Sequence, residues 1–227
     1  MSISTLQVSL VPHKPPTVYI ETTVLKFSAT TLLRLFPCTQ IIDWGNAEVS
    51  EHKYYEPQYV NPNDEIRDVI LKREVELLPS VADLVKKGRL LAVTDIETRF
   101  ESWSLPKMDS CSGVFYRAPI GEAPPPVNCD RLLFCAGRDP REMQHQFLRE
   151  IKHPRFLRLQ KVTGAHEPQS RRYWNQMLDA FALWCAEYNS CDYFLTLDFK
   201  LIRQVRGCRD AQVKPALMRP SELLGSL

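Results

Sequence analysis

Residues 191–205 read CDYFLTLDFKLIRQV, and this stretch decides the class of fold. Its first half is almost continuously hydrophobic and ends at Asp198, which is typical of a strand buried inside a parallel sheet. The second half, residues 199–205, indicates a helix that begins directly after the acid. A buried strand followed at once by a helix is the repeating unit of α/β proteins, so the stretch predicts that class.

Two earlier segments show the same order of strand, acid and helix. In TVYIETTVL, residues 17–25, a buried-strand pattern ends at Glu21. In RLLAV, residues 89–93, a second strand is followed by TDIETRFESW, which starts a helix. Alternating strand and helix signals predict an α/β fold with a mainly parallel central sheet and helices on both faces.

The segment after Glu21 predicts one helix, because apolar residues recur with helical spacing at Leu25, Leu32, Leu33 and Phe36 before a stop at Pro37. The remaining expected elements are, in chain order, an amphipathic helix over 61–88, a short helix over 140–152, an extended stretch over 155–162, a helix over 170–190, a strand over 211–217 and a terminal turn over 219–224.

The chain divides into a proline-ended lead-in, residues 1–16, and one α/β domain, residues 17–227. Two insertions are expected within the domain, at about 38–60 and 104–140. The second is rich in proline and turn residues, which indicates a long loop with room for short strands. Aromatic residues of the first insertion either stack on bases or pack beneath a partner, and we favour packing; they are Trp44, Tyr54, Tyr55 and Tyr59. We expect Trp174 and Trp184 in the core.

The composition indicates a soluble cytoplasmic protein. The 227 residues carry a net charge of +2, so a basic binding face has to come from local clustering. The seven cysteines are scattered without a C-x-x-C pair, which argues against a zinc ribbon or a disulfide framework. Neither a signal peptide nor an apolar stretch of ~18 residues is expected.

Acidic residues recur at the ends of the predicted strands. Glu21, Asp95, Glu97 and Asp198 all follow a strand, and Asp179 opens the apolar part of the helix before the last one. The carboxyl ends of parallel strands meet at one edge of a sheet, so these acids are expected to gather there. Clustered carboxylates repel one another unless a cation neutralises them, and oxygen ligands favour Mg²⁺ or Mn²⁺.

Each acid also has a structural alternative, since acids after strands often cap helices. Thr94 and Glu97 have the T-x-x-E spacing of a capping box. Asp192 begins the strand that ends at Asp198, so it lies about 20 Å from the edge where the other acids are expected, and we exclude it from the site. Glu101 lies one turn beyond Glu97 on the same helix face and is either a peripheral site residue or a solvated surface acid, of which we favour the second.

The stretch LDAFALWCAEYNSCDYFLTLDFKLI, residues 178–202, combines a helix-opening Asp179, an apolar helix and a hydrophobic strand that ends in Thr196, Leu197 and Asp198. In this it resembles the PIN-domain family, metal-dependent ribonucleases that include the toxins of many bacterial toxin–antitoxin pairs. By this resemblance Asp179 and Asp198 are the third and fourth acids of the family, and Thr196 helps to order the site.

Three other segments are similar to PIN-domain motifs and follow the same order. LLAVTDIE, residues 90–97, resembles the segment with the second acid, which is Glu97 here. VYIETTVL, residues 18–25, resembles the first strand, with Glu21 where the family usually has Asp. VKPALMRPSELL, residues 213–224, is similar to the closing strand and its P-x-E-L turn.

The resemblance implies a PIN-like fold and a Mg²⁺- or Mn²⁺-dependent endoribonuclease that hydrolyses RNA phosphodiester bonds. Thr22 or Thr23 would hydrogen-bond a water on the metal, or a carboxylate. An RNA substrate, an antitoxin-like regulatory protein and a homodimer are the implied partners. The implied catalytic and metal-holding residues are Glu21, Glu97, Asp179 and Asp198.

Basic residues near the last predicted helix are candidates for RNA binding, because basic faces bind phosphates. They are Arg171, Arg172, Lys200, Arg203 and Arg206. A solvated surface is the alternative reading of such a run. Two further hypotheses stay open for the whole chain: a catalytically impaired PIN-like module that binds RNA or protein, and an unrelated α/β protein whose acids are all helix caps.

Overall fold

The computed structural model describes residues 14–227 except for 44, 46–48, 104–112, 130–138, 167, 169–171 and 209–211. Its centre is a five-stranded sheet in the order β5-β4-β1-β6-β7, and every pair of neighbours is parallel. The strands are β1 (Thr17–Ile20), β4 (Leu91–Thr94), β5 (Ile120–Glu122), β6 (Tyr193–Leu195) and β7 (Ala216–Met218). The sheet confirms the predicted α/β class.

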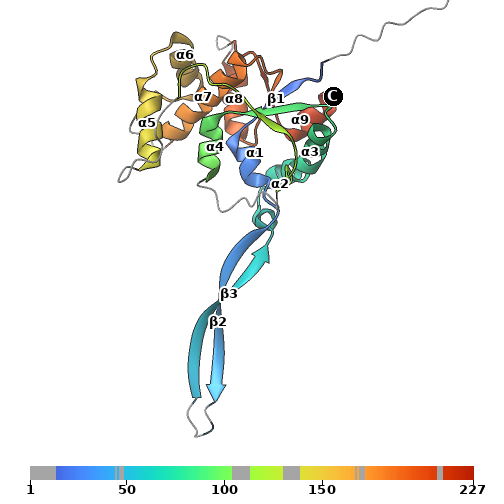
Figure 1. Ribbon diagram of the computed structural model, residues 1–227, viewed down its shortest axis with the longest axis vertical. Helices are drawn as coiled ribbons and strands as arrows, with labels where there is room; N and C mark the ends of the chain where they lie inside the picture. Colours follow the sequence, from blue (N-terminus) through green and yellow to red (C-terminus); the bar gives the residue numbers. More distant parts are fainter. Residues whose placement is uncertain are drawn as a thin grey trace, which may run out of the picture.

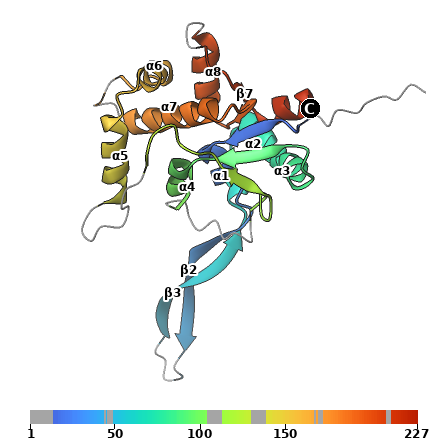
Figure 2. The ribbon, with the colours of Figure 1, turned by 45° about the horizontal axis from the view of Figure 1, so that its top comes forward.

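Helices cover both faces of this sheet (Figures 1 and 2). Successive side chains of a strand point to opposite faces, and on β1 Tyr19 joins one hydrophobic core while Val18 and Ile20 join the other. The first core is shared with α5 (Pro140–Glu150), α6 (Pro154–Thr163), α7 (Tyr173–Tyr188) and α8 (Phe199–Gly207). The second is shared with α1 (Thr22–Phe27), α2 (Val69–Glu76), α3 (Leu78–Lys86) and α9 (Pro220–Ser226).

The segment after β1 differs from the single long helix predicted from its sequence. Helix α1 ends at Phe27, and β2 (Leu32–Asp43) then pairs with β3 (Val49–Val60) as an antiparallel ribbon. Exposure along β2 alternates with a period of two residues from Leu32 to Pro37, as in a strand. Pro37 does not end the element, because a ribbon strand has an open edge where the N–H of proline is not needed. The insertion predicted at 38–60 is therefore largely this ribbon.

The helix predicted over 61–88 is divided into a 3₁₀ turn, η1 (Pro62–Glu65), and the helices α2 and α3. Asn61 caps the first turn, and Asp68 caps α2 by accepting hydrogen bonds from the backbone N–H groups of the next turn. Gly88 has φ +67°, a left-handed conformation that glycine adopts readily, and it ends this region as predicted.

One other segment differs from the prediction. Residues 155–162 belong to helix α6 rather than to an extended stretch, because Pro154 fits the first helical turn and His153 caps it through Nδ1. The proline-rich insertion contributes a short strand, β5, which agrees with the expectation that this region has room for short strands and which pairs with β4 at the edge of the sheet.

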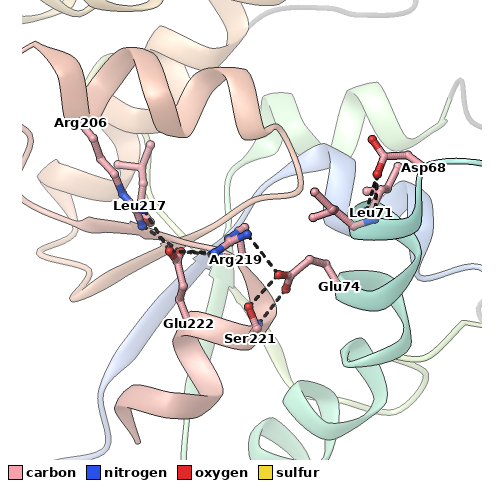
Figure 3. Close-up of polar contacts among 9 residues, drawn as sticks. Asp68, Leu71, Glu74, Arg206, Leu217, Arg219, Ser221 and Glu222 are labelled. Atoms are coloured by element: carbon pink, nitrogen blue, oxygen red, sulfur yellow. Dashed lines mark hydrogen bonds and ion pairs between the residues drawn. The ribbon is translucent and has the colours of Figure 1, made fainter.

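The C-terminal helix α9 is fixed by a polar network (Figure 3). The buried Glu74 accepts hydrogen bonds from the backbone N–H and the hydroxyl of Ser221, at 2.9 and 2.7 Å. Glu222 accepts from the Arg219 backbone N–H and pairs with Arg206 at 2.8 Å. The P-x-E-L turn seen in the sequence therefore joins α9 to α2 and α8.

The aromatic residues fall into two groups. Trp184 is 5% exposed and lies in the first core, as predicted, with Trp174 packed against the edge of that core. The tyrosines of the ribbon are 40–76% exposed; they are Tyr54, Tyr55 and Tyr59. Trp44 lies outside the described residues.

The cysteines that the structure describes are all free thiols, and they are Cys38, Cys129, Cys185, Cys191 and Cys208. None of the helices in the described part of the chain has the length and apolar character needed to cross a membrane.

Candidate functional site

The candidate site lies where the order of the strands reverses direction. From β1 the chain builds β4 and β5 on one side, and later β6 and β7 on the other. Ligands of open α/β sheets bind at such a switch point, outside the carboxyl ends of the strands. Glu21 directly follows β1, and Asp198 lies three residues after the end of the neighbouring β6.

Glu21 is almost fully buried at 6% exposure, and its Oε2 atom accepts two hydrogen bonds. One comes from the hydroxyl of Thr23, and the other comes from the hydroxyl of Thr196 at 3.0 Å. Burial raises the pKa of Glu21, and the two hydroxyl groups oppose that rise. The threonines therefore hold the side chain in one position in the interior.

Asp198 caps helix α8 through one carboxylate oxygen. Its Oδ1 atom accepts from the backbone N–H groups of Lys200 and Leu201, at 2.8 and 2.9 Å. The Asp198 N–H in turn donates to the Thr196 hydroxyl at 2.9 Å, so Thr196 bridges Glu21 and Asp198. No described residue hydrogen-bonds the second carboxylate oxygen, which the helix cap leaves available.

Asp179 of α7 lines the same depression as Asp198 and is half-buried. Burial raises its pKa well above the usual range, and the carboxylates of Glu21, Asp198 and Glu101 raise it further. Lys200 opposes this rise. Within the described part of the chain no group donates a hydrogen bond to the Asp179 carboxylate, so its charge has electrostatic neighbours only.

Glu101 joins this group, and its predicted place on the solvated surface is wrong. It comes from α4 (Ile96–Trp103), is half-buried and accepts a hydrogen bond from the Thr22 hydroxyl at 2.6 Å. Burial raises the pKa of Glu101 to about 7, and the carboxylates of Glu21, Asp95 and Glu97 contribute to the rise. Its position one turn beyond Glu97 was the only feature of the sequence that pointed to a place near the other acids.

Asp95 and Glu97 end up in a different environment. Asp95 is fully buried and accepts from the backbone N–H groups of Glu97 and Thr98 and from the hydroxyl of Tyr19. The predicted T-x-x-E capping box is wrong, because the Thr94 hydroxyl donates to a β1 carbonyl and Asp95 is the residue that caps α4.

Glu97 is 2% exposed and accepts a hydrogen bond at 2.9 Å from Gln144 of α5. It contributes to the raised pKa of Glu101. Of the four acids predicted to share a site, Glu21 and Asp198 both raise the pKa of Asp179. Glu101 contributes to the same rise, and Glu97 in turn raises the pKa of Glu101.

A depression of about 290 Å³ opens beside Asp179 and Asp198. Basic and amide side chains complete its lining: Arg172, Lys200, Asn175, Gln176 and Gln204. Acidic, basic and amide side chains thus share one surface.

Not all the candidate RNA-binding residues lie at this depression. Arg206 is paired with Glu222 and donates to the Leu217 carbonyl, so it supports α9 rather than the site. Arg203 donates to the Phe199 carbonyl within α8. Arg171 lies outside the described residues. Arg172 and Lys200 are therefore the candidates that the structure places beside the acids.

The position of Asp192 confirms the prediction that it lies away from the carboxyl ends of the strands. Its carboxylate accepts the Thr17 N–H at 2.7 Å, at the start of β1 and the opposite end of the strands from Glu21.

The acids fit a hard divalent cation by their chemistry. Among the described residues no three Asp, Glu, His or Cys side chains stand close enough to hold one ion together. Mg²⁺ is usually bound by one or two carboxylates and keeps several waters, so Asp179 and the second oxygen of Asp198 suffice as protein ligands. Comparison of the chain with family models, characterised proteins and solved structures finds no match. The function is therefore argued from the site itself.

Proposed function

We propose that the protein is a Mg²⁺- or Mn²⁺-dependent endoribonuclease of the PIN type, which hydrolyses RNA phosphodiester bonds at the switch point of its sheet. The residues assigned to the site are Glu21, Asp179 and Asp198, with Glu101 as the fourth acid. Glu97 is assigned to the contact between α4 and α5, because its carboxylate accepts the Gln144 amide.

One observation carries the proposal. Asp179 is half-buried, faces three other carboxylates and receives no hydrogen bond from the described residues. An ionised carboxylate in such a place is costly unless a cation neutralises it. A fold without a ligand at this edge would gain stability from an amide or an apolar residue at position 179.

Mg²⁺ or Mn²⁺, when bound here, supplies charge neutralisation for the phosphate and a lowered pKa for the attacking water. The residues of the chain hold the carboxylates of the site in fixed positions. Thr23 and Thr196 fix the Glu21 carboxylate, and the first turn of α8 fixes Asp198. Preorganised groups of this kind cost no reorganisation during the reaction, which is where their catalytic value lies.

The depression supports a polyanionic substrate. Lys200 is exposed at its rim and Arg172 lies in the same lining, so a phosphate next to the scissile bond meets positive charge within this lining. The amide side chains of Asn175, Gln176 and Gln204 are donors and acceptors for sugar or base edges. The assignment of RNA as the substrate follows the resemblance to PIN domains.

The test is cleavage of labelled single-stranded RNA by purified protein with Mn²⁺, Mg²⁺ or EDTA. Asp198→Asn keeps a side-chain oxygen for the helix cap but removes the charge, so we expect normal folding and a loss of at least ~100-fold in rate. Asp192→Asn is the matched control, because it makes the same change at the other end of the same strand.

Cleavage that requires the divalent ion and disappears only in Asp198→Asn supports the proposal. Equal cleavage by the two variants, or cleavage in EDTA, points to a contaminating nuclease and contradicts it. RNA binding without cleavage by the wild-type protein, unchanged in Asp198→Asn, identifies a binding module instead.

A further inference from the structure

The β2–β3 ribbon projects away from the body of the protein in both views (Figures 1 and 2). Its pairing is regular from Leu32 opposite Val60 to Asp43 opposite Val49. An isolated two-stranded ribbon is only marginally stable in water, and further strands or a helix against one face stabilise it. Within the described part of the chain, no further strand or helix packs against the ribbon faces to provide this stabilisation.

The two faces of the ribbon differ in composition. Residues directly opposite each other share a face, so the pairs from Leu33–Tyr59 to Ile41–Glu51 define one of them. We call this the apolar face. Every residue on it is exposed, including Leu35 at 63%, Ile41 at 69% and Tyr59 at 76%. Its members are Leu33, Leu35, Pro37, Thr39, Ile41, Glu51, Lys53, Tyr55, Pro57 and Tyr59.

The opposite face is more polar and makes contacts within the chain. Arg34 pairs with Glu65 of η1 through its two terminal guanidinium nitrogens, Nη1 and Nη2. The Cys38 thiol lies 3.6 Å from a Glu56 carboxylate oxygen. The exposed hydrophobic surface is thus concentrated on the apolar face, and a patch of this size on a protein surface commonly marks an interaction site.

The edges of the ribbon are poor docking sites. Pro37 pairs with Tyr55, and Pro57 pairs with Leu35. A proline has no N–H to give its partner, so these are the pairs whose N–H groups point outward, to the edges. One proline in the middle of each edge removes an outward donor, which hinders the addition of another strand. The face, rather than the edge, remains as the surface to cover.

We propose that the apolar face is covered by the apolar face of a second copy of this chain, so that two ribbons form a four-stranded, two-layer sandwich. The face carries one Lys and one Glu, so two copies do not repel each other, and a nucleic acid finds no cluster of cations. A face that meets its own copy makes a closed two-fold interface. Two layers ~10 Å apart give each ribbon the packing it lacks.

The size of the face sets the strength of this dimer. Five residue pairs at ~6.8 Å spacing, over a ribbon ~10 Å wide, give a flat footprint of ~350 Å² on each copy. Side chains stand out from this footprint, so the buried accessible area approaches the lower limit of ~1,000–1,200 Å² for specific interfaces. We expect a dimer that dissociates on dilution, independently of any nuclease activity.

Sedimentation equilibrium of the full chain between about 1 and 300 μM measures this dimer directly. The mass should rise from 26.2 kDa toward twice that value as the concentration increases. Tyr55→Glu places a charge in the middle of the apolar face, and we expect the dimer to weaken at least ~10-fold. Gln58→Glu is the matched control, because it adds the same charge to the exposed opposite face of the same strand.

A mixing experiment separates loss of the interface from loss of the ribbon. Tyr55→Glu and Tyr55→Lys should each be monomeric alone, while an equal mixture should recover association because opposite charges then meet. A wild-type protein that stays monomeric up to 300 μM overturns the proposal. So does a dimer that Gln58→Glu weakens as much as Tyr55→Glu does, or a mixture that gains nothing over its components.

Discussion

The ends of β4 and β6 start from the same sequence pattern and reach opposite outcomes. Both strands are buried, each is followed by an aspartate, and the aspartate caps the next helix. At the end of β4, both carboxylate oxygens of Asp95 accept hydrogen bonds, including one from the buried Tyr19. At the end of β6, the cap occupies only one oxygen of Asp198, and Asp179 lies in the same cluster without a hydrogen bond from the described residues.

The comparison separates two uses of an acid at a strand end. A carboxylate whose oxygens are all hydrogen-bonded contributes to stability, because its charge is distributed over fixed donors. A carboxylate that faces other carboxylates with free oxygen positions opposes stability until a cation arrives. Asp95 has the hydrogen bonds of the first case, although burial still raises its pKa, and Asp179 is an example of the second case.

The largest effect on stability is expected at the β4 end. Asp95→Ala removes the cap of α4 and leaves the buried Tyr19 hydroxyl with Thr98 alone, so we expect a loss of about 3 kcal/mol in the free energy of unfolding. Asp198→Ala removes only a cap and also relieves repulsion, so about 1 kcal/mol or less is expected. Urea unfolding in EDTA measures both, and equal losses would contradict the distinction between the two ends.

The free energy of unfolding should decrease as the pH rises, because the buried acids hold their protons more tightly in the folded state than in the unfolded state. Burial and like charges raise the pKa values of Glu21, Asp95, Glu101 and Asp179, and that of Glu101 moves from 4.5 to about 7. These groups keep their protons in the folded state at pH values where the unfolded chain has lost them. The contribution of Glu101 is complete below pH ~4.5 and is lost as the pH rises through ~7, and the contributions of the other groups have the same sign.

Glu101→Gln isolates part of this dependence. In EDTA the variant should show a smaller decrease in unfolding free energy between pH 5 and 7.5 than the wild-type protein, because one carboxyl no longer titrates. His145, with a lowered pKa, acts in the opposite direction in both proteins and cancels in the difference. Parallel pH profiles for the two proteins would mean that Glu101 is not held as the structure indicates.

A bound cation should reverse the repulsion at the β6 end. An ion that binds only the folded state at about 100 times its Kd adds ~2.7 kcal/mol, which corresponds to a rise of about 5–10 °C in Tm for a chain of this length. Calorimetry of the protein with Mn²⁺ and with EDTA measures the rise. Asp179→Asn should lose most of it, and Asp192→Asn, at the other end of the strands, should keep it. A rise that is equal in the two variants would place the ion elsewhere.

The sequence was sufficient for the features that local hydrophobic runs define. The strands that end at Glu21 and near Asp198 were predicted with the helices that follow, because buried strands and amphipathic helices are visible in short windows. The ribbon was missed, since Leu32, Leu33 and Phe36 also fit a helical spacing. The period of two in Leu33, Leu35 and Pro37 was the competing signal.

Contacts between residues far apart in the sequence decide which acids lie together, and these contacts could not be predicted from local patterns. Glu101 accepts a hydrogen bond from Thr22, a residue 79 positions earlier, and Glu97 accepts one from Gln144, 47 positions later. Arg206 pairs with Glu222, so its charge is used within the fold. A pattern of acids after strands therefore predicts which edge carries the site, while tertiary partners decide which acids belong to it.

The smallest effect on the cleavage rate is expected for a substitution of Glu97. Comparing it with the same substitution at Glu101 tests which of the two acids belongs to the site. Glu97→Gln keeps an oxygen for the Gln144 amide, so cleavage should stay within about fivefold of the wild-type rate. Glu101→Gln makes the same change four residues later and removes a charge from the cluster around Asp179, so a loss of at least ~10-fold is expected. Initial rates on one RNA, at saturating Mn²⁺ and with matched circular dichroism spectra, compare the pair. The reverse order of losses would return Glu97 to the metal site, as the resemblance to PIN domains implies, and would make Glu101 the structural member of the pair.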